Sequence, residues 1–265
     1  MHAMDEILIE RDGHVATLTL NRPERMNTIS QPMLSALSRE LLACESDPGV
    51  RAIVITGAGR GFCAGLDLQD AASEEGISKG GFALAAHLDL REFPPNVLHH
   101  MDKPTICAVN GGAAGFGLDL ALGCDIRVAA RSAKLAAAFT RRGVVPESGG
   151  TWLLPRLLGW AKASEIVFSG RTLGAEEALE LGLVNHVAED EALLETTYAL
   201  AGEIAASAPL AVQAAKRMMR AGLSEGFDEN VERVYLQVLP LLQSRDFKEG
   251  FTAFLEKRAP EFEGR

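Results

Sequence analysis

Two glycine-rich stretches of this 265-residue chain have the composition of anion-binding loops. In one, PTICAVNGGAAGFGLDLALGCD over residues 104–125, an apolar strand is predicted to break at glycines before a helix that begins near Phe116 or Gly117. In the other, the apolar run 51–56 leads into GAGRGFCAGLD over residues 57–67, which is predicted to enter a short helix. A strand that ends in this way leaves backbone N–H groups unpaired beyond its end. Because such groups stabilise a phosphate, a carboxylate or a developing oxyanion, the two stretches together predict one site with a donor from each.

The elements that would hold these loops follow the order of an α/β protein with a helical rear part. A hairpin around Asp12-Gly13 precedes a helix with Ser30 as its N-cap, and the strand 52–56 follows, so the sheet is predicted to be parallel there. A helical stretch ending near His100 is predicted to be interrupted at Pro94-Pro95, after an insertion at 71–81. Apolar spacing predicts further strands at 105–109, 125–130, 134–137 and 183–187, and helices at 193–206, 209–221, 229–242 and 247–258.

The composition argues against several classes of function. A formal charge of −10 is unlike the basic surface of a nucleic-acid-binding protein, and no apolar run approaches the roughly 20 residues of a membrane span. The four cysteines lack metal-ligand spacing and lie among apolar or small residues, which predicts buried free thiols in a reducing compartment. The first residues form no leader-like apolar run, so a cytoplasmic protein is predicted. The six histidines form no metal-binding pattern, so no metal site is predicted.

Four segments, in order, resemble the crotonase superfamily of enoyl-CoA hydratases and isomerases. They are NRPERMNTIS, GRGFCAGLDL, AVNGGAAGFGLDLALGCDIRVA and GVVPESGGTWLLPRLLG, and the tail FTAFLEKRAPEF resembles the C-terminal signature of the family. The resemblance implies an α/β, crotonase-like fold of stacked β-β-α units, with a core at 1–200 and a helical trimerisation region at 201–265. It also implies acyl-CoA thioester substrates without a further cofactor, and a homotrimer or a hexamer made of two trimers.

The resemblance assigns the two oxyanion donors to the backbone N–H groups of Leu66 and Phe116. Hydratases of the family hold a water molecule between two glutamates, which correspond here to Asp119 and Phe139. Phe139 cannot carry a proton and is expected to line the substrate site instead. The usual two-glutamate hydration therefore lacks one of its two acid–base carboxylates. Asp119 also lies in a predicted first helical turn, where an acid is stabilised in any case, and an auxiliary role for it stays open.

Glu147 corresponds to the single catalytic carboxylate of one branch of enoyl-CoA isomerases and of the epoxyphenylacetyl-CoA isomerases. One carboxylate is enough for a 1,3-proton shift, because it can take a proton from C2 and return it at C4. The competing interpretation is a surface acid next to the N-terminus of a helix. The residues that the resemblance assigns to substrate and coenzyme A binding, besides Phe139, are Arg25, Met26, Ala64, Asp67, Leu68, Phe254 and Lys257.

Other functions are weighed against this one. An enoyl-CoA hydratase using Asp119, or an acyl-CoA-binding protein without activity, would keep the same fold. Gly57-Ala-Gly59 after a strand could belong to a dinucleotide-binding oxidoreductase, but the glycine spacing is wrong for that fingerprint. A serine hydrolase of the nucleophile-elbow type would need the GxSxG motif, which the sequence lacks.

Overall fold

The computed structural model describes residues 6–67 and 93–265. Leu68 and the predicted insertion at 71–81 lie outside the described residues. A six-stranded sheet with the order β1-β2-β3-β5-β7-β10 forms the centre of the molecule. β1 and β2 form the predicted antiparallel hairpin, and every other pair in this sheet is parallel. Its strands are β1 (Ile7–Asp12), β2 (Val15–Leu20), β3 (Ala52–Gly57), β5 (Thr105–Val109), β7 (Ile126–Ala130) and β10 (His186–Ala188).

A second sheet is built from three-residue strands in the order β4-β6-β8-β9. Three times in succession, a strand of the large sheet is followed at once by a strand of the small one: β3 by β4 (Gly61–Cys63), β5 by β6 (Gly112–Ala114) and β7 by β8 (Lys134–Ala136). The fourth strand, β9 (Thr172–Gly174), pairs antiparallel with β8. These pairs, with the helices that follow β4 and β6, give the predicted stack of β-β-α units.

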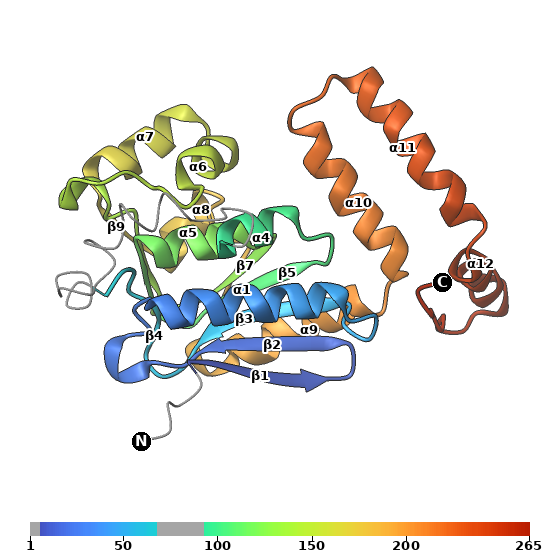
Figure 1. Ribbon diagram of the computed structural model, residues 1–265, viewed down its shortest axis with the longest axis horizontal. Coiled ribbons are helices and arrows are strands. Elements are labelled where there is room, and N and C mark those ends of the chain that lie inside the picture. The colour runs from blue at the N-terminus through green and yellow to red at the C-terminus, as the bar shows by residue number, and fades with distance from the viewer. Residues whose placement is uncertain (1–5, 68–92) are drawn as a thin grey trace.

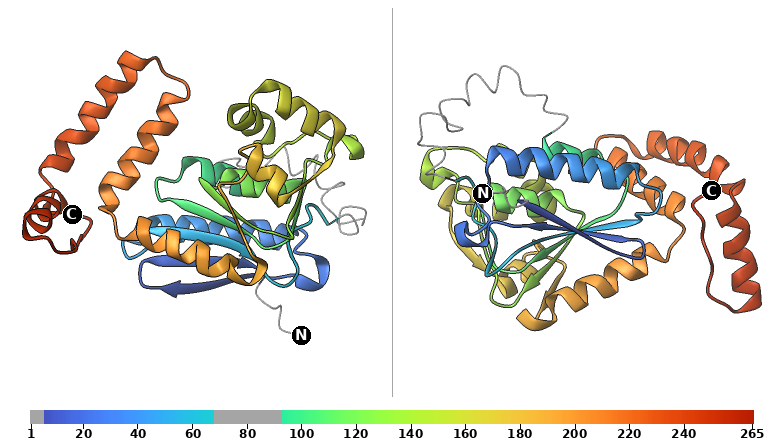
Figure 2. Two further views of the ribbon diagram at one scale, coloured as in Figure 1. Left: turned by 180° about the vertical axis from the view of Figure 1, so that it is seen from behind. Right: turned by 60° about the horizontal axis from the view of Figure 1, so that its bottom comes forward.

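Helices cover both faces of the large sheet. α1 (Gln31–Ser46) lies on one face and α9 (Leu193–Ala205) on the other, with the strands between them (Figure 2). The hydroxyl of Ser30 accepts a hydrogen bond from the N–H of Met33, which confirms the predicted N-cap of α1. α5 (Phe116–Gly123) packs between α4 (Pro94–His100) and α6 (Gly150–Leu158), and α7 (Trp160–Ser169) packs on α6. α8 (Ala175–Glu180) contacts β8, β9 and β10.

Pro94 and Pro95 open α4, where the missing N–H of proline costs nothing because first-turn N–H groups have no partner in the helix. A helix therefore starts at the predicted interruption, and the predicted helical stretch before it lies outside the described residues. One local prediction differs from the structure. The glycine-rich stretch 57–67 is not only a loop, because β4 lies within it. The apolar strand 105–109 and the helix start at Phe116 are as predicted.

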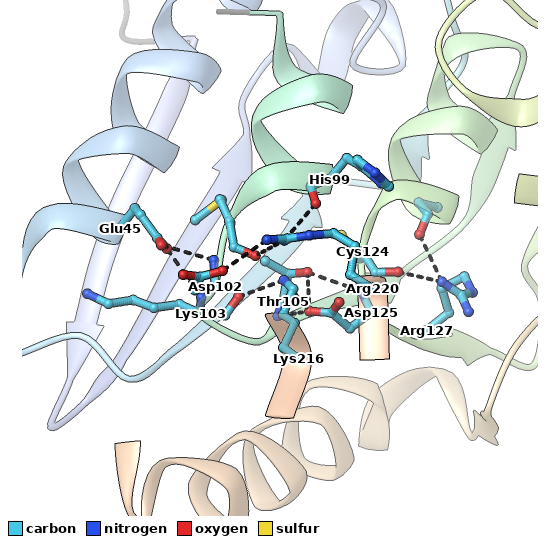
Figure 3. Close-up of polar contacts among 12 residues, drawn as sticks. Glu45, His99, Asp102, Lys103, Thr105, Cys124, Asp125, Arg127, Lys216 and Arg220 are labelled. Atoms are coloured by element: carbon cyan, nitrogen blue, oxygen red, sulfur yellow. Dashed lines mark hydrogen bonds and ion pairs between the residues drawn. The ribbon is translucent and has the colours of Figure 1, made fainter. Parts of the chain in front are cut away.

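The C-terminal helices form an arm that projects from the core (Figure 1). They are α10 (Pro209–Gly222), α11 (Phe227–Leu242) and α12 (Arg245–Glu256), and α11 buries none of its side chains in this chain. Polar contacts bind α10 to the core (Figure 3). The Lys216 ammonium group donates to the carbonyl of Lys103 at 2.8 Å and to the carboxylate of Asp125 at 2.7 Å, and Asp125 also accepts from the N–H of Thr105 at the start of β5.

All four cysteines are buried and free, as predicted. Over residues 6–67 and 93–265, no helix combines the length and the apolar character that a membrane crossing requires. The same residues contain no group of three or more histidine, cysteine or acidic side chains placed to hold a metal ion.

Candidate active site

The first predicted donor, the N–H group of Leu66, lies in a segment that pairs with the residues before α1. The N–H of Ile29 donates to the carbonyl of Gly65 at 2.8 Å, and the N–H of Asp67 donates to the carbonyl of Ile29 at 3.3 Å. In such a parallel bridge, Ile29 is hydrogen-bonded to the carbonyl of Gly65 and to the N–H of Asp67, the two neighbours of Leu66. The N–H of Leu66 itself points away from Ile29. That N–H is therefore directed out of the pairing and is available to another acceptor.

The second predicted donor, the N–H group of Phe116, belongs to the first residue of α5. First-turn N–H groups of a helix have no acceptor within the helix. Gly115, which precedes it, has φ of +54°, and its own N–H donates to the carbonyl of Ala136 in β8 at 3.0 Å. This contact ties the start of α5 to the small sheet and fixes where the first turn begins.

Two glycines bring these segments together. A methyl group added to Gly65 would lie 2.8 Å from the carbonyl oxygen of Ala114 and 3.7 Å from the nitrogen of Phe116. One added to Gly117 would collide with the carbonyl of Cys63. The lack of side chains at these two positions is what allows the loop after β4 and the start of α5 to touch.

A cavity of about 620 Å³ opens between these loops and the segment 138–147. Five residues predicted for the site line it: Ala64, Leu66, Phe116, Phe139 and Glu147. Val144 and Val145 add apolar surface, and Arg142 adds a cation. The described lining residues therefore combine an apolar wall, one carboxylate and two loops with N–H groups at their ends, which is suited to a largely apolar ligand with one polar carbonyl.

Glu147 and Asp119 are near each other in the fold but lie in different surroundings. Glu147 is exposed on the cavity wall, where its Oε1 accepts a hydrogen bond of 3.4 Å from the hydroxyl of Ser148. Asp119 has no exposed surface. Its Oδ2 accepts from the N–H groups of Ser148 at 3.1 Å and Gly150 at 3.3 Å, whereas its Oδ1 is buried with no hydrogen-bond partner in the described part of the chain.

Burial and the negative charge of Glu147 raise the pKa of Asp119, and the two N–H donors lower it, so that together they place it at about 7. Sequence reasoning identified Asp119 as an acid in a first helical turn but missed its contact with the segment that carries Glu147. It also missed Arg142, for which the only signal is the pair Arg141-Arg142 before Gly143.

The residues predicted to bind coenzyme A fall into separate groups. Arg25 donates to both carboxylate oxygens of Asp67, at 2.8 and 2.6 Å, and Arg22 adds a third contact at 3.3 Å. Asp67, which is 3% exposed, thus holds the loop with Arg25 and Met26 against the segment after β4, where the N–H of Ala64 donates to the carbonyl of Met26. Its carboxylate is engaged inside the protein rather than presented to a ligand.

Phe254 and Lys257 lie away from the cavity of their own chain. Both belong to the end of α12, which in Figure 1 is at the opposite side of the molecule from β4 and β9. Phe254 is 81% exposed, and Lys257 ends the helix in a left-handed conformation with φ of +54°. Neither residue lines the cavity of its own chain.

The structure also speaks against a dinucleotide-binding fold. After β3, the glycine segment leads into β4 and the small sheet, whereas a dinucleotide-binding fingerprint requires a helix that begins within the glycines. In the large sheet β3 lies between β2 and β5, as in the stack of β-β-α units described above.

Comparisons with known proteins agree with this architecture. The family model described as enoyl-CoA hydratase/isomerase matches residues 10–265. The chain is 41% identical to 1,2-epoxyphenylacetyl-CoA isomerase of Escherichia coli, over 99% of this chain and 100% of that protein. It is 37% identical to the 2,3-dehydroadipyl-CoA hydratase of the same organism, over 99% and 100%. A solved structure of an enoyl-CoA hydratase from Bacillus anthracis superposes with a TM-score of 0.90 at 32% identity, over 98% and 100% of the two chains. The chain has the crotonase fold and belongs to the enoyl-CoA hydratase/isomerase family.

Proposed function

We propose that this enzyme shifts a carbon–carbon double bond, converting a 3-enoyl-CoA into a 2-enoyl-CoA, with Glu147 as the only proton carrier. The observation that carries the proposal is that, among the described residues, Glu147 is the one carboxylate that lines a cavity also lined by Leu66 and Phe116. Phe139 occupies the cavity wall where a second carboxylate would be needed for water addition.

The reaction needs one base and one anion-binding site. Glu147 takes a proton from C2, and the electron pair of the C–H bond forms a dienolate whose negative charge is on the thioester oxygen. Glu147 then returns the proton at C4, the double bond ends between C2 and C3, and no water is consumed. The N–H groups of Leu66 and Phe116 stabilise the charged oxygen, each by roughly 3 kcal/mol in comparable sites.

The substrate is an acyl-CoA thioester, whose acyl chain would contact Phe116, Phe139 and Val145. We propose that Arg25, Met26, Ala64 and Leu68 contact the coenzyme, with Asp67 holding the loop of Arg25 and Met26. Phe254 and Lys257 would come from a neighbouring subunit of a homotrimer or of a hexamer made of two trimers, because α12 lies away from the cavity of its own chain.

An enoyl-CoA hydratase is the second candidate. Asp119 favours it, because a carboxyl group with a pKa of about 7 can both donate and accept a proton near neutral pH. Asp119 is buried, however, and a water nucleophile would have to reach it from the cavity. A protein that binds acyl-CoA without reaction is the third possibility.

The test is mass spectrometry of 2-enoyl- and 3-enoyl-CoA incubated with the protein in deuterated water. Migration of the double bond without addition of water is the expected result. A mass increase of one whole water molecule would establish hydration and give Asp119 the central role. If neither compound changes while coenzyme A esters bind, the protein is a binding protein for the esters tried.

Glu147→Gln is the decisive variant, because it keeps the size of the side chain and removes the base. We expect kcat for double-bond migration to fall roughly 10²- to 10⁴-fold, with KM nearly unchanged. Glu10→Gln, in an exposed position on β1, is the matched control and should keep full activity. Wild-type turnover by Glu147→Gln would rule out the proposed proton carrier.

A further inference from the structure

The buried carboxylate of Asp119 connects α5 to the segment that carries Glu147. Its Oδ2 accepts from the N–H of Ser148, which belongs to the peptide group that joins Glu147 to Ser148, and from the N–H of Gly150 at the first residue of α6. The contact therefore restrains the main chain on the C-terminal side of Glu147. It joins residues that are 29 and 31 positions apart in the sequence.

The opposite side of this contact is shaped to receive the carboxylate. A methyl group added to Gly150 would collide with Oδ1 of Asp119 and would lie 2.9 Å from Cβ of Pro146. Gly149 has φ of +106°, a conformation that side chains rarely adopt, and it turns the chain from the Glu147 segment into α6. Two adjacent glycines thus let the peptide chain wrap closely around Asp119.

α5 carries both the proposed second oxyanion donor and the residue that anchors the Glu147 segment. Phe116, the second oxyanion donor, is the first residue of α5, and Asp119 is one helical turn further on. At a rise of about 1.5 Å per residue, the two positions are about 4.5 Å apart along the helix axis. A displacement of α5 would consequently move the donor and the anchor of the Glu147 segment together.

We propose that Asp119 is a positioning residue, which fixes the main chain of Glu147 relative to the N–H group of Phe116. The inference rests on the proposed role of Glu147 as the proton carrier. Its physical basis is that proton transfer requires the base and the reacting carbon at near contact distance, and that a misplacement of about 1 Å can cost roughly 100-fold in rate. Asp119 performs this role as a hydrogen-bond acceptor, without exchanging a proton with the substrate.

An acceptor and an acid–base group respond differently to substitution. Asp119→Asn keeps a side-chain oxygen for the two N–H groups but cannot carry a proton, whereas Asp119→Ala removes both properties. We expect the asparagine variant to keep kcat within about tenfold of the wild type and the alanine variant to lose roughly 100-fold in kcat at nearly constant KM. Equal losses in the two variants would overturn the proposal, because proton transfer by Asp119 would then be required.

Gly150→Ala changes the partner of Asp119 in the same contact. It allows the proposal to be tested even if Asp119→Ala does not fold. Its methyl group pushes on the carboxylate, so kcat should fall as in Asp119→Ala, and unchanged kcat would contradict the proposal. The matched control is Gly202→Ala in α9, where an added methyl group meets nothing within 4 Å.

Amide hydrogen exchange of residues 144–152 gives a readout that does not depend on the reaction. In Asp119→Ala we expect Ser148 and Gly150 to exchange roughly tenfold faster under native conditions, with protection restored in Asp119→Asn. Unchanged exchange in the alanine variant would show that Asp119 does not order the segment. Failure of the isomerase proposal appears elsewhere, as wild-type turnover by Glu147→Gln, so the two hypotheses fail in different measurements.

Discussion

The two carboxylates near the cavity are suited to different tasks by their surroundings. Glu147 is exposed on the cavity wall, and within the described ranges its carboxylate has one weak hydrogen bond, from the hydroxyl of Ser148, so it is free to meet a substrate. Asp119 is enclosed and receives two backbone hydrogen bonds, which fix its orientation. A buried carboxylate is costly to ionise, and this cost has a measurable consequence for stability.

The pKa of Asp119 predicts how stability changes with pH. Its surroundings, burial foremost, raise it in the folded protein to about 7 from its ordinary value of 3.8, so the folded state binds this proton more tightly than the unfolded state. The stability that Asp119 contributes is therefore full below pH 4 and is lost as the pH rises through 7. A shift of this size corresponds to roughly 4 kcal/mol.

Asp119→Asn removes this dependence, because the amide does not titrate. Relative to the wild type, the free energy of unfolding of the variant should rise by up to that amount between pH 4 and pH 8, as measured by urea unfolding. Asp190→Asn is a control of opposite sign, because hydrogen bonds from Ser132 lower the pKa of Asp190 and its contribution is lost as the pH falls. Parallel pH curves for the wild type and Asp119→Asn would show that Asp119 is not perturbed.

At the level of single residues, the sequence predicted what touches the cavity better than what holds the cavity together. Leu66, Phe116, Phe139 and Glu147 could be assigned because each lies in a short motif whose order in the chain is fixed. The contact of Asp119 with the segment after Glu147 depends on how α5 packs on α6, and no local pattern encodes it. Asp67 illustrates the same limit, because a carboxylate in a motif gives no sign that arginines from another loop enclose it.

At the level of elements, the site depends on the close contact between the loop after β4 and the start of α5. Gly65→Ala tests this contact, because the added methyl group would lie 2.8 Å from the carbonyl of Ala114 and would push the two donor segments apart. We expect kcat to fall roughly 10²- to 10³-fold, as for the loss of an oxyanion donor. The measurement is steady-state kinetics together with thermal unfolding.

The control for Gly65→Ala is Gly13→Ala in the β1–β2 turn. Gly13 also has positive φ, +53°, but an added methyl group there meets nothing within 4 Å, so only backbone strain is introduced. The control should lose some stability, of about 1 kcal/mol, and keep its kcat. Full activity of Gly65→Ala would mean that the two segments need not touch.

The long elements were predictable from apolar spacing, and the short ones were not. β3 and β5 are fully buried and read as apolar runs, as parallel strands do. β4 (Gly-Phe-Cys) and β6 (Gly-Ala-Ala) have three residues each, too few to show an apolar pattern, and exist only because neighbouring strands pair with them. Pro94 and Pro95, at which a break was predicted, form the start of α4, because proline favours the first turn of a helix.

At the level of the whole molecule, the projecting arm is attached by polar contacts and carries unburied apolar surface. Arg220 in α10 donates to the carbonyls of His99 and Met101 and pairs with Asp102, beside the Lys216 contacts (Figure 3). Hydrogen bonds of this kind set the direction of α10 but leave the apolar side chains of α11 uncovered. Because exposed apolar surface of this extent is favourable to bury, we expect it to form an interface.

The exposed face of α11 therefore predicts self-association that completes the active site. Leu236 is 67% exposed, and Leu236→Glu would place a charge in the interface, whereas Leu42→Glu changes a 43% exposed leucine on α1 and is the control. By sedimentation equilibrium, the wild type and the control should have three or six times the 28.3-kDa mass of the chain, and Leu236→Glu should shift to smaller species. Since Phe254 and Lys257 are proposed to contact the ester bound to a neighbouring subunit, the dissociated variant should show a raised KM for the coenzyme A ester, with a smaller change in kcat. A wild-type protein that sediments as a monomer and still has a low KM would contradict both the assembly and the role of these two residues.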